Sequence, residues 1–261
     1  MEIRQGVGVV AVQEIDVETR PEERRMKLRT LAIVQLALWS VLGSSAIAAD
    51  QANLYLVHGI PGRAIPGNLD PALPIDILVN GESCLVRGLT FTNTTGPFTL
   101  SPGRYDLRIS PANPDAPCTN PPLIDSQVTL TAGASVSVVA AISASQPVPL
   151  DFREDLFALP PGNARFVFLQ SADAPTLRAT LTQVHVKHAK TFTLTADRGG
   201  QQEADVPAGT YLVQVYAAGS TTVMTSQQIG LGDGYATFTY ATGAADTSSL
   251  VLVNRVIRAA F

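Results

Sequence analysis

Two stretches of the chain, residues 100–109 and 206–215, show the same alternation of apolar and polar side chains. In each, a proline and a glycine precede a tyrosine, after which apolar residues recur at every second position. This period is typical of a β-strand with one face on a core and the other in water, and Pro and Gly suit a tight turn before it. We therefore expect a structural turn that leads into a strand in both places. Its residues are Pro102, Gly103 and Tyr105 in the first stretch and Pro207, Gly209 and Tyr211 in the second.

The alternating stretches belong to a longer internal repeat. Residues 53–58 match residues 165–170, and residues 130–139 match residues 229–238, on either side of the repeated turn. Three matches in the same order indicate a tandem duplication. The spacing between matching stretches shortens along the chain, so the first copy carries net extra residues in two places.

These extra residues fall where proline and glycine are too frequent for regular strand pairing. The two stretches are residues 60–74 and 111–122, which we interpret as loops of the first copy. Loops on a rigid scaffold often carry binding residues. The candidate binding residues in these loops are Arg63, Asn68, Asp70, Asn113, Asp115 and Asn120.

Short strands separated by turn residues, with no amphipathic helix after residue 50, predict an all-β fold. Asn80-Gly81 directly follows an apolar run and favours a type I′ hairpin turn. Each copy is expected to form an antiparallel β-sandwich, immunoglobulin-like in that its turn tyrosine resembles a tyrosine corner. Two tandem sandwiches are thus predicted after an N-terminal signal helix, at residues 50–157 and 163–261.

Residues 26–48 have the parts of a secretory signal peptide. A basic start is followed by an apolar run at residues 31–42 and by small residues that end at Ala48. Residues 30–49 also make a stretch of about 20 residues, just enough to cross a bilayer, so an uncleaved anchor is the alternative. Small residues at its end favour cleavage. Residues 1–25 are then an upstream extension that is not part of the mature protein.

Composition and charge narrow the classes of function. Of the 261 residues, 46% are hydrophobic, which is enough to bury a substantial core and is not typical of a disordered chain. Only 15% are charged, and the formal net charge is -4. The chain therefore lacks the basic patch that nucleic-acid binding requires, and we expect no nucleic-acid partner.

The two cysteines, Cys84 and Cys118, both lie in the first copy. Behind an export signal, such a pair indicates a disulfide. A catalytic thiol would need a neighbouring base and a reducing compartment, and a metal site would need more soft ligands than two cysteines. We expect the bridge to tie the loop at residues 111–122 to the strand that follows Asn80-Gly81.

No catalytic constellation stands out among the remaining residues, and we predict no catalytic residue, metal or cofactor. His58 follows an apolar strand and is matched by Gln170 in the second copy, which favours a structural hydrogen bond over catalysis. His185 and His188 would lie on opposite faces of a strand, so they are not expected to bind a metal together. The acidic residues of the first copy are interpreted as solvated turn residues, with a calcium loop as the weaker alternative. They are Asp70, Asp76, Asp106, Asp115 and Asp125.

Several of these motifs together resemble the bacterial extracytoplasmic family known as domain of unknown function 4397. The resemblance covers residues 53–145 well and residues 164–242 more loosely. It implies an exported protein, often with tandem β-sandwich domains, and no assigned activity. The second copy has Gln170 in place of the histidine and lacks the Asn-Gly turn and both cysteines. The motifs that carry the resemblance are residues 54–59, 75–81, 102–106 and 110–118.

We expect an exported, non-enzymatic protein of the bacterial envelope or exterior, in the periplasm or outside the cell. Its role would be binding or structural, through loops of the first domain, with a protein or polysaccharide partner. It would touch the membrane only through an uncleaved signal segment. One alternative is a hydrolase with a cryptic site near His58. Another is a self-associating surface or matrix protein, suggested by the apolar run at residues 250–257, which is either a closing strand or a strand donated to a neighbour.

Overall fold

The computed structural model describes residues 51–67, 69–154, 158–245 and 249–259. The predicted signal peptide, the extension before it and Asn68 lie outside the described residues. Regular structure in the described ranges consists of β-strands and one short 3-10 helix, η1 (Gly62–Ala64). No helix there is long and apolar enough to cross a membrane. The prediction of an all-β fold is confirmed.

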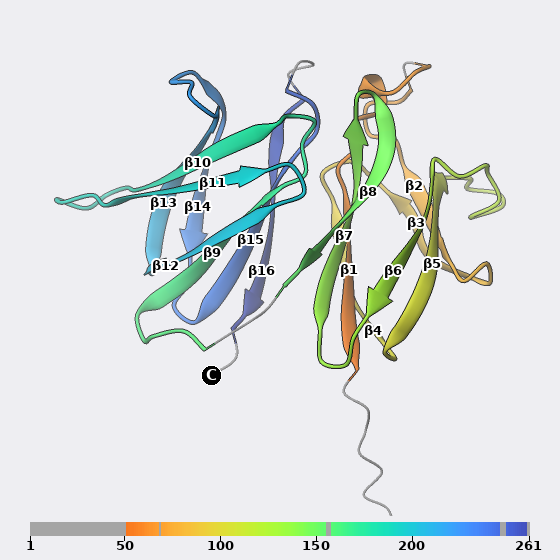
Figure 1. The fold of residues 1–261 in the computed structure, drawn as a ribbon, viewed down its shortest axis with the longest axis horizontal. Coiled ribbons are helices and arrows are strands. Elements are labelled where there is room, and N and C mark those ends of the chain that lie inside the picture. The colour runs from red at the N-terminus through yellow and green to blue at the C-terminus, as the bar shows by residue number, and fades with distance from the viewer. Residues whose placement is uncertain (1–50, 68, 155–157, 246–248, 260–261) are drawn as a thin grey trace, which may run out of the picture. The chain divides into compact units, whose positions relative to one another are not determined.

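The first half of the described chain forms a sandwich of two four-stranded sheets (Figure 1). Its strands are β1 (Ala52–His58), β2 (Ile75–Val79), β3 (Ser83–Leu89), β4 (Thr94–Leu100), β5 (Gly103–Pro111), β6 (Ile124–Leu130), β7 (Ser135–Ser143) and β8 (Gln146–Arg153). One sheet has the order β4-β1-β7-β8 and the other β3-β2-β5-β6. Side chains such as Leu54, Ile77 and Leu107 fill the core between the two sheets.

The second half forms a sandwich with the same strand order. Its strands are β9 (Asn163–Gln170), β10 (Thr176–Gln183), β11 (Thr191–Asp197), β12 (Gln201–Pro207), β13 (Gly209–Ala217), β14 (Val223–Leu231), β15 (Tyr235–Thr242) and β16 (Val251–Arg258). The sheets are β12-β9-β15-β16 and β11-β10-β13-β14, and no sheet of the described residues mixes strands from both halves. The apolar C-terminal run is strand β16, which pairs with β15 of its own chain.

Each sandwich contains one parallel strand pair. Strand β1 runs parallel to β7, and β9 runs parallel to β15, whereas all other neighbours in the sheets are antiparallel. The sheets are therefore antiparallel-rich rather than purely antiparallel. The reason is the path of the chain, which passes through the opposite sheet before β7 or β15 returns beside the first strand in the same direction.

The two turns that the sequence analysis singled out lead into β5 and β13. In β5, Leu107 and Ile109 are buried while Asp106 and Arg108 are exposed, as the alternation predicts. The hydroxyl of Tyr105 donates to the carbonyl oxygen of Ser101 at 2.7 Å. In the second sandwich, the hydroxyl of Tyr211 donates to the carbonyl oxygen of Pro207 at the same 2.7 Å. Each tyrosine thus closes the turn before its own strand, as a tyrosine corner does.

Strands β1 and β9 are apolar on both faces because each face is buried against a different layer. One face of β1 lies in the first core, and the other contributes Val57 to a separate apolar cluster. In β9, Phe166 and Phe168 lie in the second core, while Val167 and Leu169 belong to that same separate cluster. The structure shows a third apolar layer, in which the β1-containing sheet packs on the β9-containing sheet.

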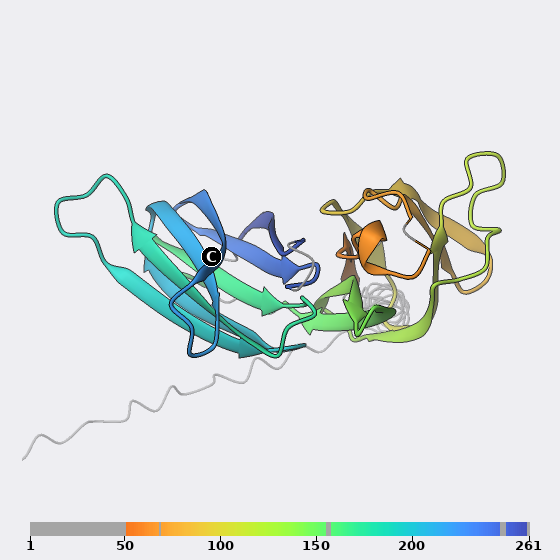
Figure 2. The same cartoon turned by 90° about the horizontal axis from the view of Figure 1, so that it is seen from above.

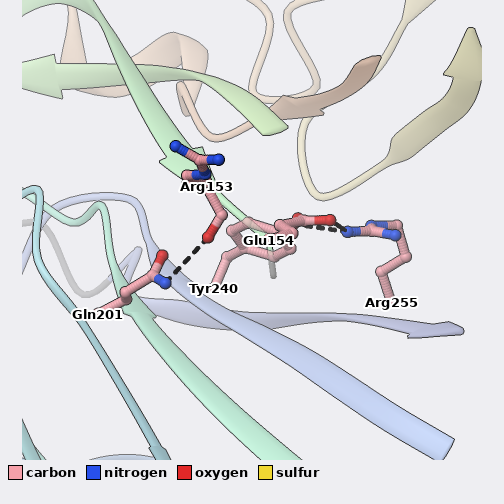
Figure 3. Close-up of polar contacts among 5 residues, drawn as sticks. All are labelled: Arg153, Glu154, Gln201, Tyr240 and Arg255. Atoms are coloured by element: carbon pink, nitrogen blue, oxygen red, sulfur yellow. Dashed lines mark hydrogen bonds and ion pairs between the residues drawn. The ribbon is translucent and has the colours of Figure 1, made fainter. Parts of the chain in front are cut away.

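A buried polar group lies within this apolar layer (Figure 3). Glu154, which directly follows β8, is 2% exposed and accepts a hydrogen bond of 2.6 Å from the hydroxyl of Tyr240 on β15. Its other carboxylate oxygen forms an ion pair with Arg255 on β16. The Arg255 guanidinium also stacks 3.6 Å from the centre of the Tyr55 ring. Burial and the Glu154 charge raise the pKa of Tyr240, so this hydroxyl remains a donor.

At another point where these two sheets meet, the side chain of Thr242 lies close to the backbone of Gly59. The hydroxyl of Thr242 donates to the carbonyl oxygen of Gly59 at 3.1 Å. A Cβ atom at Gly59 would lie 2.0 Å from the Thr242 hydroxyl oxygen, so only glycine fits there. These contacts and the buried ion pair join the same two sheets that meet in the apolar layer.

Candidate binding site on the first sandwich

The predicted disulfide between Cys84 and Cys118 is confirmed. Cys84 lies on β3, and Cys118 lies in the loop between β5 and β6, with 5.9 Å between their Cα atoms. We call this segment, residues 112–123, the stapled loop. Figure 2 shows it extending away from the sheets, in yellow-green. The disulfide anchors the middle of this loop to the neighbouring strand.

Asp76 is a second anchor of the stapled loop. It lies on the central strand β2 and is 1% exposed. One carboxylate oxygen accepts a hydrogen bond from the backbone N–H of Gly88 at 2.9 Å. The other accepts from the N–H groups of Asn113 at 3.1 Å and Cys118 at 2.9 Å. The interpretation of Asp76 as a solvated turn residue is therefore wrong, because its carboxylate is buried among backbone donors that satisfy it.

The stapled loop also carries its own internal hydrogen bonds. The side-chain oxygen of Asn113 accepts from the N–H groups of Asp115 at 3.2 Å and Ala116 at 3.1 Å, which caps a tight turn. Asn120 donates to the carbonyl oxygen of Pro111 at 3.1 Å, across the base of the loop. A loop with a covalent link, a buried carboxylate anchor and these internal bonds is held in one conformation.

Two surface hollows lie along the stapled loop. One, of about 320 Å³, is lined by apolar residues of the loop, by Arg87 of β3 and by Pro74. The other, of about 170 Å³, is lined by Arg108 and Ser110 of β5 together with loop residues that include Thr119 and Asn120. Both combine apolar surface with an arginine and side-chain amides or hydroxyls. This mixture can hold a ligand by contact with its apolar parts and orient it by hydrogen bonds.

The structure brings only some of the predicted binding residues together. Asn113, Asp115 and Asn120 all lie on the stapled loop. Arg63 and Asp70 lie on the other long loop, between β1 and β2, and neither lines the two hollows. The two loops do meet at their bases, where the N–H of Ala112 donates to the carbonyl oxygen of Pro74 at 2.8 Å.

The β1–β2 loop is held by His58. This residue is fully buried; its Nε2 donates to the carbonyl oxygen of Leu73 at 2.6 Å, and its Nδ1 accepts from the N–H of Ile60 at 3.3 Å. This assignment follows from the partners, since a carbonyl oxygen must receive a proton and an N–H must donate one. Burial lowers the pKa of His58 to about 4, partly offset by the bond to Leu73. Both ring nitrogens are occupied, which leaves neither free to accept a proton from a substrate.

In the second sandwich, Gln170 holds the shorter loop after β9 in the same way. Its side-chain amide donates to the carbonyl oxygen of Ala174 at 2.7 Å and accepts from the N–H of Ala172 at 2.8 Å. A glutamine amide offers the same pair of one donor and one acceptor as a neutral histidine. The match between His58 and Gln170 in the sequence therefore reflects one structural task performed by two residue types.

Sequence reasoning missed the position that corresponds to Asp76 in the second sandwich, which is Arg178 on β10. Its guanidinium donates to the carbonyl oxygen of Ser220 at 2.8 Å and lies 4.6 Å from the centre of the Tyr216 ring. Both charged residues thus bind backbone groups of the loop after the neighbouring strand, Asp76 through N–H donors and Arg178 through a carbonyl. For Asp76, the signal in the sequence was a charged residue within the otherwise apolar strand β2, whereas Arg178 occupies a half-buried position of the alternating strand β10 and gives no such signal.

Within the described residues, no group of three or more His, Cys, Asp or Glu side chains is placed to hold a metal ion. His185 and His188 are both exposed on the loop between β10 and β11. They are far from the stapled loop in the sequence, and neither lines either hollow.

Residues 52–180 match the sequence model of the family described as Domain of unknown function (DUF4397). The match covers the whole first sandwich and continues into β10 of the second. No curated protein matches the chain.

Two solved structures share a distant likeness with the chain. A "putative cell adhesion protein" from Bacteroides ovatus ATCC 8483 is 8% identical, with a TM-score of 0.28, over 82% of this chain and 99% of that chain. A protein of the same description from Bacteroides uniformis ATCC 8492 is 13% identical, with a TM-score of 0.25, over 80% of this chain and 99% of that chain. Likeness at these TM-scores carries no argument about function.

Proposed function

We propose that this chain, which belongs to the family of domain of unknown function 4397 through residues 52–180, is an exported binding protein that uses its stapled loop to contact a partner. The partner would be a protein or polysaccharide of the bacterial envelope or exterior. The observation that carries this proposal is the double anchoring of the stapled loop by the disulfide and by Asp76.

A loop fixed before binding loses less conformational entropy when it meets a partner, so the anchors raise affinity without adding contacts. The corresponding loop of the second sandwich, residues 218–222, is shorter and has no disulfide. The stability of the fold does not require a long loop at this position, as the second sandwich illustrates. This difference supports a binding role for the stapled loop of the first sandwich.

Export is supported by the disulfide, because such bonds persist mainly in oxidising compartments such as the periplasm or the cell exterior. The predicted signal peptide agrees with that location. A non-enzymatic role is supported by the environment of His58, whose ring nitrogens both serve the β1–β2 loop. The strand pairing of β16 with β15 favours its role as a closing strand over donation to a neighbour.

Site-specific photo-crosslinking in cells that produce the protein tests this proposal. A benzophenone amino acid is placed at Asp115, an exposed position of the stapled loop, and in a matched variant at Thr221, an exposed position of the corresponding loop. We expect a discrete crosslinked species from position 115 and none from position 221. The same species should weaken when Asp76→Asn removes the buried carboxylate charge that holds the loop.

Equal crosslinking from both positions would contradict the assignment of binding to the stapled loop. The absence of any crosslinked species from position 115, with the protein correctly exported and oxidised, would contradict it as well. A species that persists unchanged in the Asp76→Asn variant would show that the loop anchor does not serve binding.

A further inference from the structure

The loop between β10 and β11, residues 184–190, carries both lysines of the second sandwich. We call it the basic tip. It contains Lys187 and Lys190, which are the two lysines after residue 27, and also His185 and His188. From residue 174 to residue 196 the chain has no Asp or Glu. In a protein with net charge -4, the two lysines after residue 27 thus both lie on one short loop.

The basic tip is exposed to solvent, and backbone hydrogen bonds fix its base to the neighbouring strands. All residues from 185 to 190 are exposed, and neither lysine forms an ion pair with any described residue. At the base, the N–H of Gln183 donates to the carbonyl oxygen of Lys190 at 3.0 Å, and the N–H of Val184 donates to that of Thr210 at 3.0 Å. Figure 2 shows the tip, in teal, extending away from the sheets. Its charges are therefore held outward and available.

The first sandwich has no counterpart of this loop. There, β2 and β3 are joined by residues 80–82, which include the tight Asn80-Gly81 turn. The side chain of Asn80 accepts from the N–H of Asp106 at 3.0 Å, and Glu82 supplies a negative charge. The same hairpin is thus short and acidic in one sandwich, and long and basic in the other. The closure of the sandwich does not explain the longer form.

We propose that the basic tip binds an anionic polysaccharide, through contacts of its lysines with carboxylate groups and hydrogen bonds from its histidine side chains. Unpaired cations on a protruding hairpin can reach into a hydrated polymer, which presents many anionic groups in succession. Lys187 and Lys190 can contact two anionic groups of one polymer, and the second contact then forms within the same complex.

The chemistry of the tip favours a polysaccharide over a lipid surface. The large apolar side chain exposed there is Val186, at 49% exposure, and residues 184–190 contain no Phe, Trp or Tyr. Elements that lie in a membrane interface carry a broader apolar face, commonly with Trp, Phe or Leu. Two lysines near an anionic bilayer would contribute too little for stable attachment without such a face.

The test uses the oxidised exported chain and immobilised polygalacturonate, a polymer that carries one carboxylate per sugar. We expect saturable binding that weakens as salt screens the charges. Lys187→Gln with Lys190→Gln should weaken binding about tenfold or more, since two charge contacts are lost. Lys187→Arg with Lys190→Arg should retain it. Arg104→Gln, which changes an exposed charge of the first sandwich, should leave binding unchanged.

Two outcomes would overturn this inference. One is binding that does not depend on the two lysines, or that Arg104→Gln reduces equally, because the interaction would then reflect charge without a defined site. The other is binding to phosphatidylglycerol vesicles but not to polygalacturonate, which would assign the tip to membranes. Crosslinking from Asp115 tests the stapled loop separately, and we expect it to persist in the Lys-to-Gln variant.

Discussion

The two sandwiches share strand order, a tyrosine-closed turn and a polar side chain that holds the loop after the first strand, yet they differ in which loops are long. The first sandwich extends the loops after β1 and β5, whereas the second extends the loop after β10. Each extension leaves the sheets unchanged. The comparison indicates that the strands and their closing contacts form the scaffold, and that the loops distinguish one sandwich from the other.

The anchors of these loops differ in kind as well. The stapled loop is fixed by a covalent bond and a buried carboxylate, while the basic tip is fixed only at its base. A fully ordered loop suits a partner of defined shape, and an open loop with unpaired charges suits a polymer with repeated charges. The two proposed binding modes follow from this difference.

We expect the largest difference in stability between the two sandwiches when the disulfide is removed by replacing both Cys84 and Cys118 with serine. Because the bridge closes a loop of 34 residues, its loss should lower the free energy of unfolding of the first sandwich by at most about 4 kcal/mol. Hydrogen exchange should show faster exchange in the stapled loop and little change in the loop at residues 218–222. Equal loss of protection in both loops would mean that the anchor does not act locally.

The sequence predicted some of these anchors and not others, for physical reasons. A cysteine pair behind an export signal has one main structural use, so the disulfide could be predicted from residue type alone. Asp76 could not, because a carboxylate in a sequence gives no sign of the three backbone N–H groups that fold around it. The carboxylate was interpreted as solvated, which is the commoner state of an aspartate.

The contact between the two sandwiches was partly visible in the sequence. Apolar residues at successive positions of β1 and β9 are visible in the sequence, but the sequence alone cannot tell what covers each face of these strands. Their second faces pack together, around the pair formed by Glu154 and Arg255. These two residues are far apart in the sequence, so nothing local indicated that they meet.

An effect of intermediate size is expected on the pH dependence of stability, through the protonation of His58. His58→Gln is the matched variant, because Gln170 performs the same task in the second sandwich. The pKa of His58 is lowered from 6.5 to about 4, so the folded state favours the neutral ring. The stabilisation is complete above pH 6.5 and is lost as the pH falls toward 4, by about 3 kcal/mol in total.

Denaturant unfolding of the native chain and the His58→Gln variant at several pH values measures this effect. Other acidic groups titrate equally in both chains, so the difference between them isolates His58. We expect this difference to shift steadily against the native chain between pH 6.5 and pH 4. A difference that stays constant across this range would show that the buried ring does not exclude the proton.

The smallest losses of stability are expected when the hydroxyl is removed from the tyrosine of either turn, and the loss should be larger for Tyr211 than for Tyr105. Tyr211 is fully buried, and its hydroxyl donates to the carbonyl oxygen of Pro207 at 2.7 Å. Tyr211→Phe should cost about 1 to 2 kcal/mol, because it leaves the half-buried Pro207 carbonyl without its donor. The hydroxyl of Tyr105 bonds to the exposed Ser101 carbonyl, which water can satisfy, so Tyr105→Phe should cost only about 0.5 kcal/mol. Parallel denaturant titrations of the two variants measure both, and an equal cost would mean that the two turns close their strands in the same way despite the difference in burial.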